Sequence, residues 1–297
     1  MIPQKFNIRK AKKNDTSFLI RAIIEADKSG KSSSSYCNLL SISENELCEI
    51  LESIFEEELE DVEFGFSSFY VVTDINNNPI AACSVWIEGE NGIPSWQQRM
   101  MALRSFCKKE SIEHMLSFQE AIKGFMPDRS TLTVQLESVY VDSNYRGQGI
   151  VTMLLNYIID AHTKKDDKSV FEVMTYSNNQ SAINLYTKLG FAIVQQTTIS
   201  SRLVNSIYSS EGMIKFEKNF MNIQDKLQVI FREVFNESSL EINLTMNAND
   251  VDNWDSLSHM EMINQVEEQF GVKFKLKDLV KLKNVSDLII LIEDKLA

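Results

Sequence analysis

The chain has 297 residues, which is long for one domain and comfortable for two. It is 43% hydrophobic and 24% charged, so it is not intrinsically disordered, and its formal net charge of −12 argues against a general nucleic-acid or anionic-membrane surface. The four cysteines have no paired spacing and there are only three histidines, so neither a metal site nor a disulfide framework is expected. The sequence shows no signal peptide and no membrane-spanning run, and we therefore expect a cytoplasmic protein without a membrane partner.

Strand and helix patterns alternate through the first 217 residues, which predicts a mixed α/β (α+β) domain over 1–217. We expect strands at 6–12, 130–141, 169–179, 191–199 and 212–218, with a hairpin over 66–90 that turns on its asparagines. We expect helices at 14–26 (capped by Asn14 or Asp15), 43–60 (capped by Ser43), 149–162 and 181–190, and one or two more within 94–126. The serine-rich segment 28–37 is expected to be a loop.

The C-terminal 77 residues have a different composition. They carry 14 acidic and 8 basic residues, so their density of negative charge is higher than in the rest of the chain. Helical patterns at 221–236, 255–271 and 284–296 predict a small all-α helical bundle over 222–297. No internal repeat is apparent.

The segment NYRGQGIVTMLL, residues 144–155, places two glycines between a strand and an apolar helix. The first N–H groups of a helix have no intrahelical acceptor, and together with the helix dipole they favour an anion, most often a phosphate. The string matches neither the dinucleotide fingerprint nor the P-loop. Taken alone, it is equally consistent with a tight turn that binds nothing.

Two motifs together resemble the GCN5-related N-acetyltransferases (GNAT family). The turn resembles the family's [QR]xxGx[GA] motif at Arg146, Gly149 and Val151, with valine in place of the expected small residue. The segment NQSAINLYTKLGF, residues 179–191, resembles the family's later helix motif. The resemblance covers roughly residues 1–217 and implies a GNAT fold that binds acetyl-CoA or another acyl-CoA. The cofactor-binding residues that it implies are Val139, Val141, Arg146, Gly147, Gln148, Gly149, Ile150, Val151, Asn179 and Tyr186.

The resemblance also implies catalytic roles. Glu137 is the expected base that takes a proton from an amine, although related enzymes often have a glutamate where this chain has Gln135. Tyr186 would protonate or hydrogen-bond the leaving thiolate, and the backbone N–H of Val139 would bind the thioester oxygen. The structural alternatives are a salt-bridged strand glutamate at 137, a space-filling tyrosine at 186 and a helix-capping Asn179.

The inserted segment 94–126 offers apolar side chains that either line an acceptor pocket or form the core of a helical pair. These are Trp96, Met100, Met101, Phe106 and Met115.

Residues 252–274 resemble an acyl or peptidyl carrier protein. The Asp-Ser-Leu signature appears as Asp255, Ser256 and Leu257, and it implies that Ser256 carries 4′-phosphopantetheine, attached by a phosphopantetheinyl transferase. The alternative is that Ser256 only caps a helix. The acidic surface of this region would suit docking of other biosynthetic enzymes.

The leading hypothesis is an acyl-CoA-dependent acyltransferase fused to its carrier in small-molecule biosynthesis, with a small-molecule amine or a carrier-bound group as acceptor. One alternative is an S-acyltransferase that loads its own carrier thiol. Another is a non-catalytic CoA-binding platform in which only the carrier works.

Overall fold

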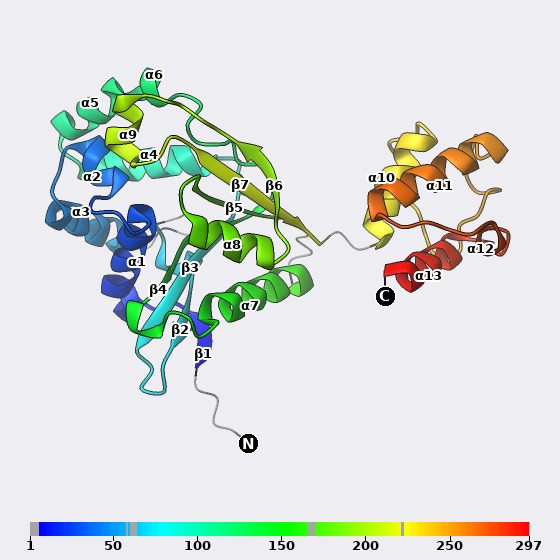
Figure 1. Cartoon of the computed structure of the whole chain (residues 1–297), viewed down its shortest axis with the longest axis horizontal. Helices are drawn as coiled ribbons and strands as arrows, with labels where there is room; N and C mark the ends of the chain where they lie inside the picture. Colours follow the sequence, from blue (N-terminus) through cyan, green and yellow to red (C-terminus); the bar gives the residue numbers. More distant parts are fainter. Residues whose placement is uncertain (1–5, 58, 60–63, 166–169, 221–222, 297) are drawn as a thin grey trace. The chain divides into compact units, whose positions relative to one another are not determined.

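The computed structural model describes residues 6–57, 59, 64–165, 170–220 and 223–296 (Figure 1). The chain divides into two compact units, Met1–Asn219 and Phe220–Ala297. Each unit is described by itself below. Within the described residues, no helix is both long enough and apolar enough to cross a bilayer.

The first unit is built on one mixed sheet of seven strands in the order β1-β2-β3-β4-β5-β7-β6. The strands are β1 (Asn7–Lys10), β2 (Phe69–Thr73), β3 (Pro79–Ile87), β4 (Val134–Val141), β5 (Val170–Tyr176), β6 (Ala192–Gln196) and β7 (Met213–Asn219). Among these described strands, β4 and β5 pair in parallel and the other neighbouring pairs are antiparallel. The predicted strands and the hairpin are confirmed.

Helices cover both faces of this sheet. Along β2, Phe69 and Val71 belong to the core that contains α1 (Thr16–Lys28) and α3 (Glu44–Glu56). The intervening Tyr70 contacts Tyr157 and His162 of α7 (Ile150–Lys165). Because successive strand residues point to opposite faces, α7 lies on the face away from α1 and α3. All five residues of β2 are therefore buried, and four of them are aromatic or aliphatic.

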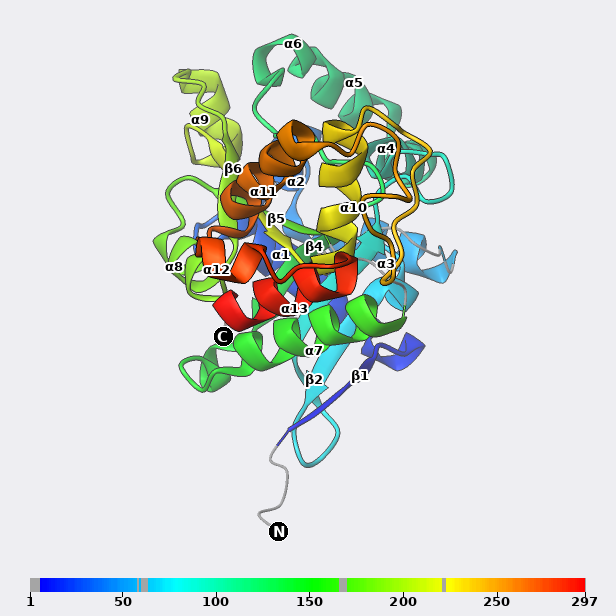
Figure 2. The ribbon, with the colours of Figure 1, turned by 90° about the vertical axis from the view of Figure 1, so that its right-hand side faces the viewer.

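A group of short helices lies at the end of this unit that is farther from β1 (Figures 1 and 2). The group comprises α2 (Ser35–Leu40), α4 (Ser95–Phe106), α5 (Lys109–Ser117), α6 (Gln119–Ile122) and α9 (Arg202–Tyr208). The helices α4, α5 and α6 interrupt the β3–β4 hairpin, as the sequence predicts, but they number three. The loop predicted over 28–37 is wrong at its end, because Ser34 caps α2 through its side chain. The helix α9 had no counterpart among the predictions.

The remaining elements of this unit are small. The helix α8 (Gln180–Lys188) follows β5, and three short 3₁₀ helices occupy Lys13–Asp15, Phe66–Ser68 and Ser143–Tyr145. Ser43 caps α3 with a complete capping box, as predicted. Asp15 precedes α1, but its side chain binds Arg9 and the Lys12 N–H and makes no capping bond.

The strands β4 and β5 separate along their length. Their parallel pairing runs only from Val134 to Leu136 on β4, although that strand continues to Val141. The register between β3 and β4 also shifts where Ser138 adopts a φ of 49°, in the left-handed region that a non-glycine residue rarely occupies. The bulge therefore falls at the point where β4 loses its partner on the other side.

The second unit is a bundle of helices (Figure 2), and it has its own apolar core. Its helices are α10 (Ile223–Val234), α11 (Ser256–Phe270), α12 (Leu276–Leu279) and α13 (Val285–Leu296). Leu227, Phe231, Val266 and Ile292 are among its most deeply buried side chains. The three helices predicted for this unit are confirmed, and the single-turn α12 is additional. The first of them was expected to begin at residue 221, but residues 221 and 222 lie outside the described residues.

Candidate active site and carrier serine

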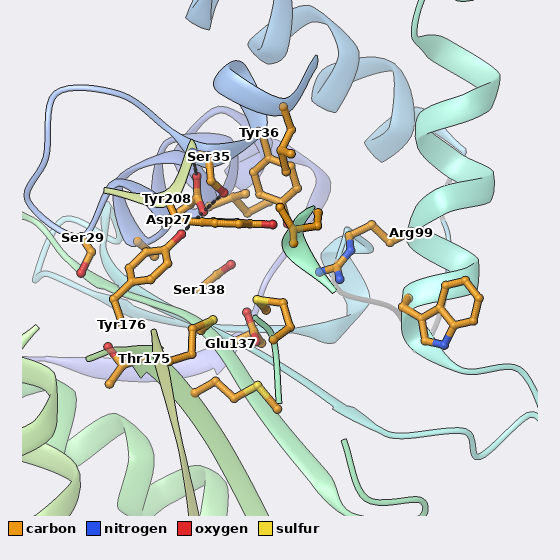
Figure 3. Close-up of a pocket in the computed structure, with 18 of the residues that line it drawn as sticks. Asp27, Ser29, Ser35, Tyr36, Arg99, Glu137, Ser138, Thr175, Tyr176 and Tyr208 are labelled. Atoms are coloured by element: carbon orange, nitrogen blue, oxygen red, sulfur yellow. Dashed lines mark hydrogen bonds between the residues drawn. The ribbon is translucent and has the colours of Figure 1, made fainter. Parts of the chain in front are cut away.

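A cavity of about 540 Å³ opens beside the separation of β4 and β5. Its wall combines α1, α2, the inserted helices, β4, β5 and α8. Figure 3 shows Glu137 and Ser138 on one side of it, with Asp27, Tyr176 and Tyr208 around them. A volume of this size suits a small organic ligand, for which about 300–1,000 Å³ is typical.

Glu137, the predicted base, lines this cavity and is held by Arg129. Arg129 Nη2 donates to Glu137 Oε1 at 2.6 Å, and Arg129 Nη1 donates to Gln135 Oε1 at 2.6 Å. The guanidinium also lies over the Trp86 ring, 5.1 Å from its centroid. Glu137 and Gln135 thus share one face of β4, as predicted, and one arginine fixes both side chains.

Gln135 is fully buried and does not line the cavity. Its Nε2 donates to Thr133 Oγ1 at 2.7 Å and to Glu172 Oε2 at 2.8 Å. Glu172 also accepts from Lys215 Nζ at 3.2 Å and from the Ser130 N–H at 3.1 Å. Burial alone would raise the pKa of Glu172, but these hydrogen bonds and the lysine charge lower it. The network ties the loop before β4 to three strands and so supports Arg129.

The β4 bulge places Ser138 and Val139 in the cavity wall. Because β5 has already separated, the backbone of this segment has no sheet partner on that side among the described residues. The role predicted for Val139, donation from its N–H to the thioester oxygen, would use this side of the strand. Val141 pairs with Ala81 of β3 and does not line the cavity.

Tyr186 on α8 also lines the cavity, and its side chain is only 4% exposed. Its ring packs against Phe191 and Phe216. Burial raises the pKa of its hydroxyl, so the group stays protonated at neutral pH. Among the described residues its hydroxyl has no hydrogen-bond partner, and it can donate to a ligand atom.

The glycine turn lies at the start of α7. Gly147 and Gly149 have φ values of 74° and 73°, and a Cβ built on either meets no heavy atom within 4 Å. The first intrahelical bond runs from the Met153 N–H to the Gly149 carbonyl, so the amides of Ile150 and Val151 have no acceptor within the helix. Arg146 and Gln148 are exposed beside this turn. Open space, unpaired amides and an arginine together fit the pyrophosphate of coenzyme A. Valine at 151 leaves the amide in place.

Asn179 is the N-cap of α8. Its Oδ1 accepts from the Ala182 N–H at 3.2 Å, and its Nδ2 donates to Ser29 Oγ at 2.5 Å. Of the two interpretations of Asn179, capping is the one that these contacts support, although the residue also borders the cavity.

A polar cluster in the cavity wall was missed from the sequence. Asp27 accepts hydrogen bonds from Ser34, from the N–H and hydroxyl of Ser35, and from Tyr176 at 3.1 Å (Figure 3). Tyr208 borders the same space, and burial raises its pKa to about 12. The serine run at 32–35, expected to be an ordinary loop, was the one available signal.

Of the inserted-helix candidates, Trp96, Met100 and Met115 line the cavity, whereas Met101 and Phe106 do not.

In the second unit, Ser256 is the first residue of α11 and is exposed. The N-cap is Asp255, whose Oδ1 accepts from the N–H groups of Leu257 and Ser258 at 2.8 and 2.9 Å. The Ser256 hydroxyl makes no hydrogen bond within the described part of the chain. The interpretation of Ser256 as a helix cap is therefore wrong, and its hydroxyl is available for modification.

Comparison with protein families gives two matches. The acetyltransferase (GNAT) family matches residues 39–191, and the phosphopantetheine attachment site family matches residues 225–292. None of the curated proteins compared with the chain matches it.

Several solved structures are similar to parts of the chain. A structure titled as an acetyltransferase shares 18% identity over 72% of this chain and 99% of its own, with a TM-score of 0.48. An N-acetyltransferase from Staphylococcus aureus Mu50 shares 15% identity over 71% of this chain and 98% of its own, also with a TM-score of 0.48. A holo acyl carrier protein from Geobacter metallireducens shares 47% identity over 26% of this chain and 87% of its own, with a TM-score of 0.25.

The GNAT match covers more than half of the chain, and the carrier match falls within the second unit. The mixed seven-stranded sheet and the helical bundle agree with these two assignments. The chain belongs to the GNAT acetyltransferase family and carries a phosphopantetheine carrier domain at its C-terminal end.

Proposed function

We propose that the first unit transfers an acyl group from acyl-CoA to an amine. The observation that carries this proposal is the convergence of Glu137, Tyr186 and the β4 bulge on one cavity beside the separated strands. A carboxylate, a protonated phenol and an unpaired backbone segment are the groups that acyl transfer from a thioester requires.

In the proposed reaction, the amine nitrogen attacks the thioester carbon, and the carbon–sulfur bond breaks. Glu137, directly or through a water, takes the proton that the amine must lose. The Val139 N–H donates to the thioester oxygen as that oxygen gains negative charge. Tyr186 hydrogen-bonds the departing sulfur. Because burial raises the pKa of Tyr186, hydrogen bonding is favoured over transfer of its proton.

The turn at Arg146 to Val151 would hold the pyrophosphate of coenzyme A. Its two positive-φ glycines let the backbone approach the phosphates without a Cβ between them. The amides of Ile150 and Val151 and the exposed Arg146 supply donors and charge. Gly147 and Gln148 complete the turn. Val141 and Asn179 are proposed to contact the pantetheine arm.

Ser256 is proposed to bear 4′-phosphopantetheine, attached by a phosphopantetheinyl transferase. The acceptor amine is then either a free small molecule or an aminoacyl group held on this arm, in a small biosynthetic pathway. Other biosynthetic enzymes would use the same arm. Carrying both functions on one chain raises the effective concentration of each for the other.

Transfer to the carrier thiol is a second candidate, which the ion pair between Glu137 and Arg129 favours. A thiol has a pKa near 8.5, so it depends less on a general base than an amine does. Thiol transfer is therefore compatible with a Glu137 carboxylate that is paired with Arg129. A non-catalytic CoA-binding platform has less support. Its indications were Val151 and Gln135, the two departures from the family pattern. Valine at 151 keeps the backbone amide, and the Gln135 side chain belongs to a buried network.

The intact mass of the phosphopantetheinylated protein after incubation with acetyl-CoA tests these proposals, with Ser256→Ala as the control. An arm on Ser256 that gains an acetyl group supports the thiol candidate. An arm that stays a free thiol, together with acetylation of added amines, supports the leading proposal. Absence of an arm in the presence of a competent phosphopantetheinyl transferase contradicts the role of Ser256. Cofactor binding without turnover on any amine or thiol favours the platform.

A further inference from the structure

The apolar groups of the cavity are concentrated in the inserted segment between β3 and β4. The polar groups come from α1, α2 and the strands, and the inserted segment adds Arg99, Arg104 and Gln119. Asp27 already accepts four hydrogen bonds from protein groups. The inserted segment between β3 and β4 supplies mostly apolar side chains. Those that line the cavity are Trp96, Met100, Leu103, Met115, Leu116, Ile122 and Met126.

Methionine is concentrated in this wall. Five of the 12 methionines of the chain line the cavity, and they are Met100, Met115, Met126, Met174 and Met213. They lie on three different parts of the fold, namely the inserted segment, β5 and β7. A methionine side chain is unbranched and polarisable, and it adapts to a flexible apolar ligand.

The cavity is also larger than an acetyl group needs. Its volume of about 540 Å³ lies within the range of pockets that enclose ligands of drug size. A long polar substituent would find the Asp27 carboxylate already occupied by Ser34, Ser35 and Tyr176. An apolar chain would replace water along the methionine-rich wall, and this exchange is favourable.

We propose that this cavity binds a flexible apolar chain of several methylene groups, carried by one of the two reactants of the transfer. The chain is either the acyl group of the donor or an alkyl part of the amine. The identity of the two reactants rests on the proposed function. The binding of an apolar chain rests on the composition of the cavity wall alone.

Two series of substrates separate the two sources. In the first, acyl-CoA donors from two to ten carbons are compared with one small amine. In the second, acetyl-CoA is compared with n-alkylamines of increasing length. Burial of one methylene favours binding enough to raise kcat/KM about fourfold, so one of the series should climb by about that factor per carbon until the cavity is filled.

A substitution that fills part of the cavity tests whether the cavity holds the apolar chain. Met126→Trp adds bulk to a lining position that is 39% exposed, and it should reduce the ratio of long-chain to short-chain kcat/KM by tenfold or more. Met101→Trp is the matched control, because Met101 is on α4, is 63% exposed and does not line the cavity. It should leave that ratio at the wild-type value.

Binding without turnover keeps this inference separate from the proposed function. Calorimetry with S-alkyl-CoA thioethers, and with alkylamines in the presence of CoA, should show the same chain-length dependence and the same effect of Met126→Trp. Chain-dependent binding with no transfer would overturn the proposed function and leave the apolar site standing. Affinities and kcat/KM values that are flat in both series, or equal effects of the two tryptophan variants, would overturn the apolar site.

Discussion

Replacing Glu137 by glutamine tests the proposed base with little change in shape. Glutamine keeps an oxygen that can accept from Arg129, so the 2.6 Å hydrogen bond can persist while the negative charge is lost. Arg129 also keeps its bond to Gln135, which limits the disturbance of the loop. The substitution therefore removes proton acceptance more selectively than a truncation to alanine would.

The expected loss depends on the acceptor. At pH 7.4, an amine with a pKa of about 10.4 is roughly 0.1% unprotonated, whereas a thiol with a pKa of about 8.5 is roughly 7% ionised. General base catalysis contributes about 10²–10⁴-fold, or about 3–5 kcal/mol of the barrier. We expect Glu137→Gln to lower kcat for an amine by about 10²-fold or more, and for a thiol by less than about tenfold.

The assay is single-turnover acyl transfer from acyl-CoA to an amine and to the holo-carrier thiol, measured between pH 6 and 10. For the amine, the variant should regain activity as the pH approaches the pKa of the amine, because the acceptor then loses its proton without help. Thermal unfolding and CoA affinity serve as controls and should change little. Equal losses for both acceptors, or a pH profile unchanged in shape, would refute the role of Glu137.

Three further predictions concern other parts of the first unit. Tyr186→Phe keeps the aromatic packing but removes the donor to sulfur, so kcat should fall about 10–100-fold with the Kd for CoA unchanged; an unchanged kcat would exclude the role. Gly149→Ala forces alanine into a φ of 73° and puts a methyl group into the open side of the turn, so stability should fall by about 1–2 kcal/mol and KM for acyl-CoA should rise about tenfold. Gly92→Ala, with a φ of 79° and equally open surroundings, is the control and should lower stability without changing KM. Because the pKa of Glu172 in the fold lies below its ordinary value of 4.5, its contribution to stability is present above about pH 4.5 and is lost as the pH falls through the lower value. The Tm of Glu172→Gln should therefore depend less on pH between 3 and 6 than that of the wild type, and parallel curves would contradict this.

The features that the sequence predicts well are those that depend on local backbone. The turn at Gly147 and Gly149 requires positive φ, which glycine adopts readily, and the pattern of residues therefore marks it. The capping box that begins at Ser43 needs only residues within one turn of helix. The hairpin of β2 and β3 turns at Asn77, which has a φ of 63° and is of a type that tolerates this conformation.

The features that the sequence does not predict depend on contacts between distant segments. Asp27 meets Tyr176 across 149 positions of the chain, and nothing near either residue indicates the pair. The bulge at Ser138 has a left-handed φ without a glycine to signal it. The pairing of Arg129 with Glu137 depends on a loop that Lys215 and Glu172 hold from two other strands. The positions of Arg129 and Glu137 therefore depend on the assembled sheet and not on nearby residues in the sequence.

The capping of α11 by Asp255 has a consequence for how the carrier is used. A helix that loses its capping side chain typically becomes less stable by about 0.5–2 kcal/mol, and this would happen on every modification if Ser256 were the cap. The Asp255 carboxylate accepts from the N–H groups of Leu257 and Ser258, and the Ser258 hydroxyl accepts from the Asp255 N–H. Because Ser256 takes no part in this capping, its esterification breaks none of these bonds. The unmodified, pantetheine-bearing and acylated forms should therefore share one fold of nearly equal stability. The proposed charging and discharging of an arm on Ser256 could then be repeated while α11 stays intact.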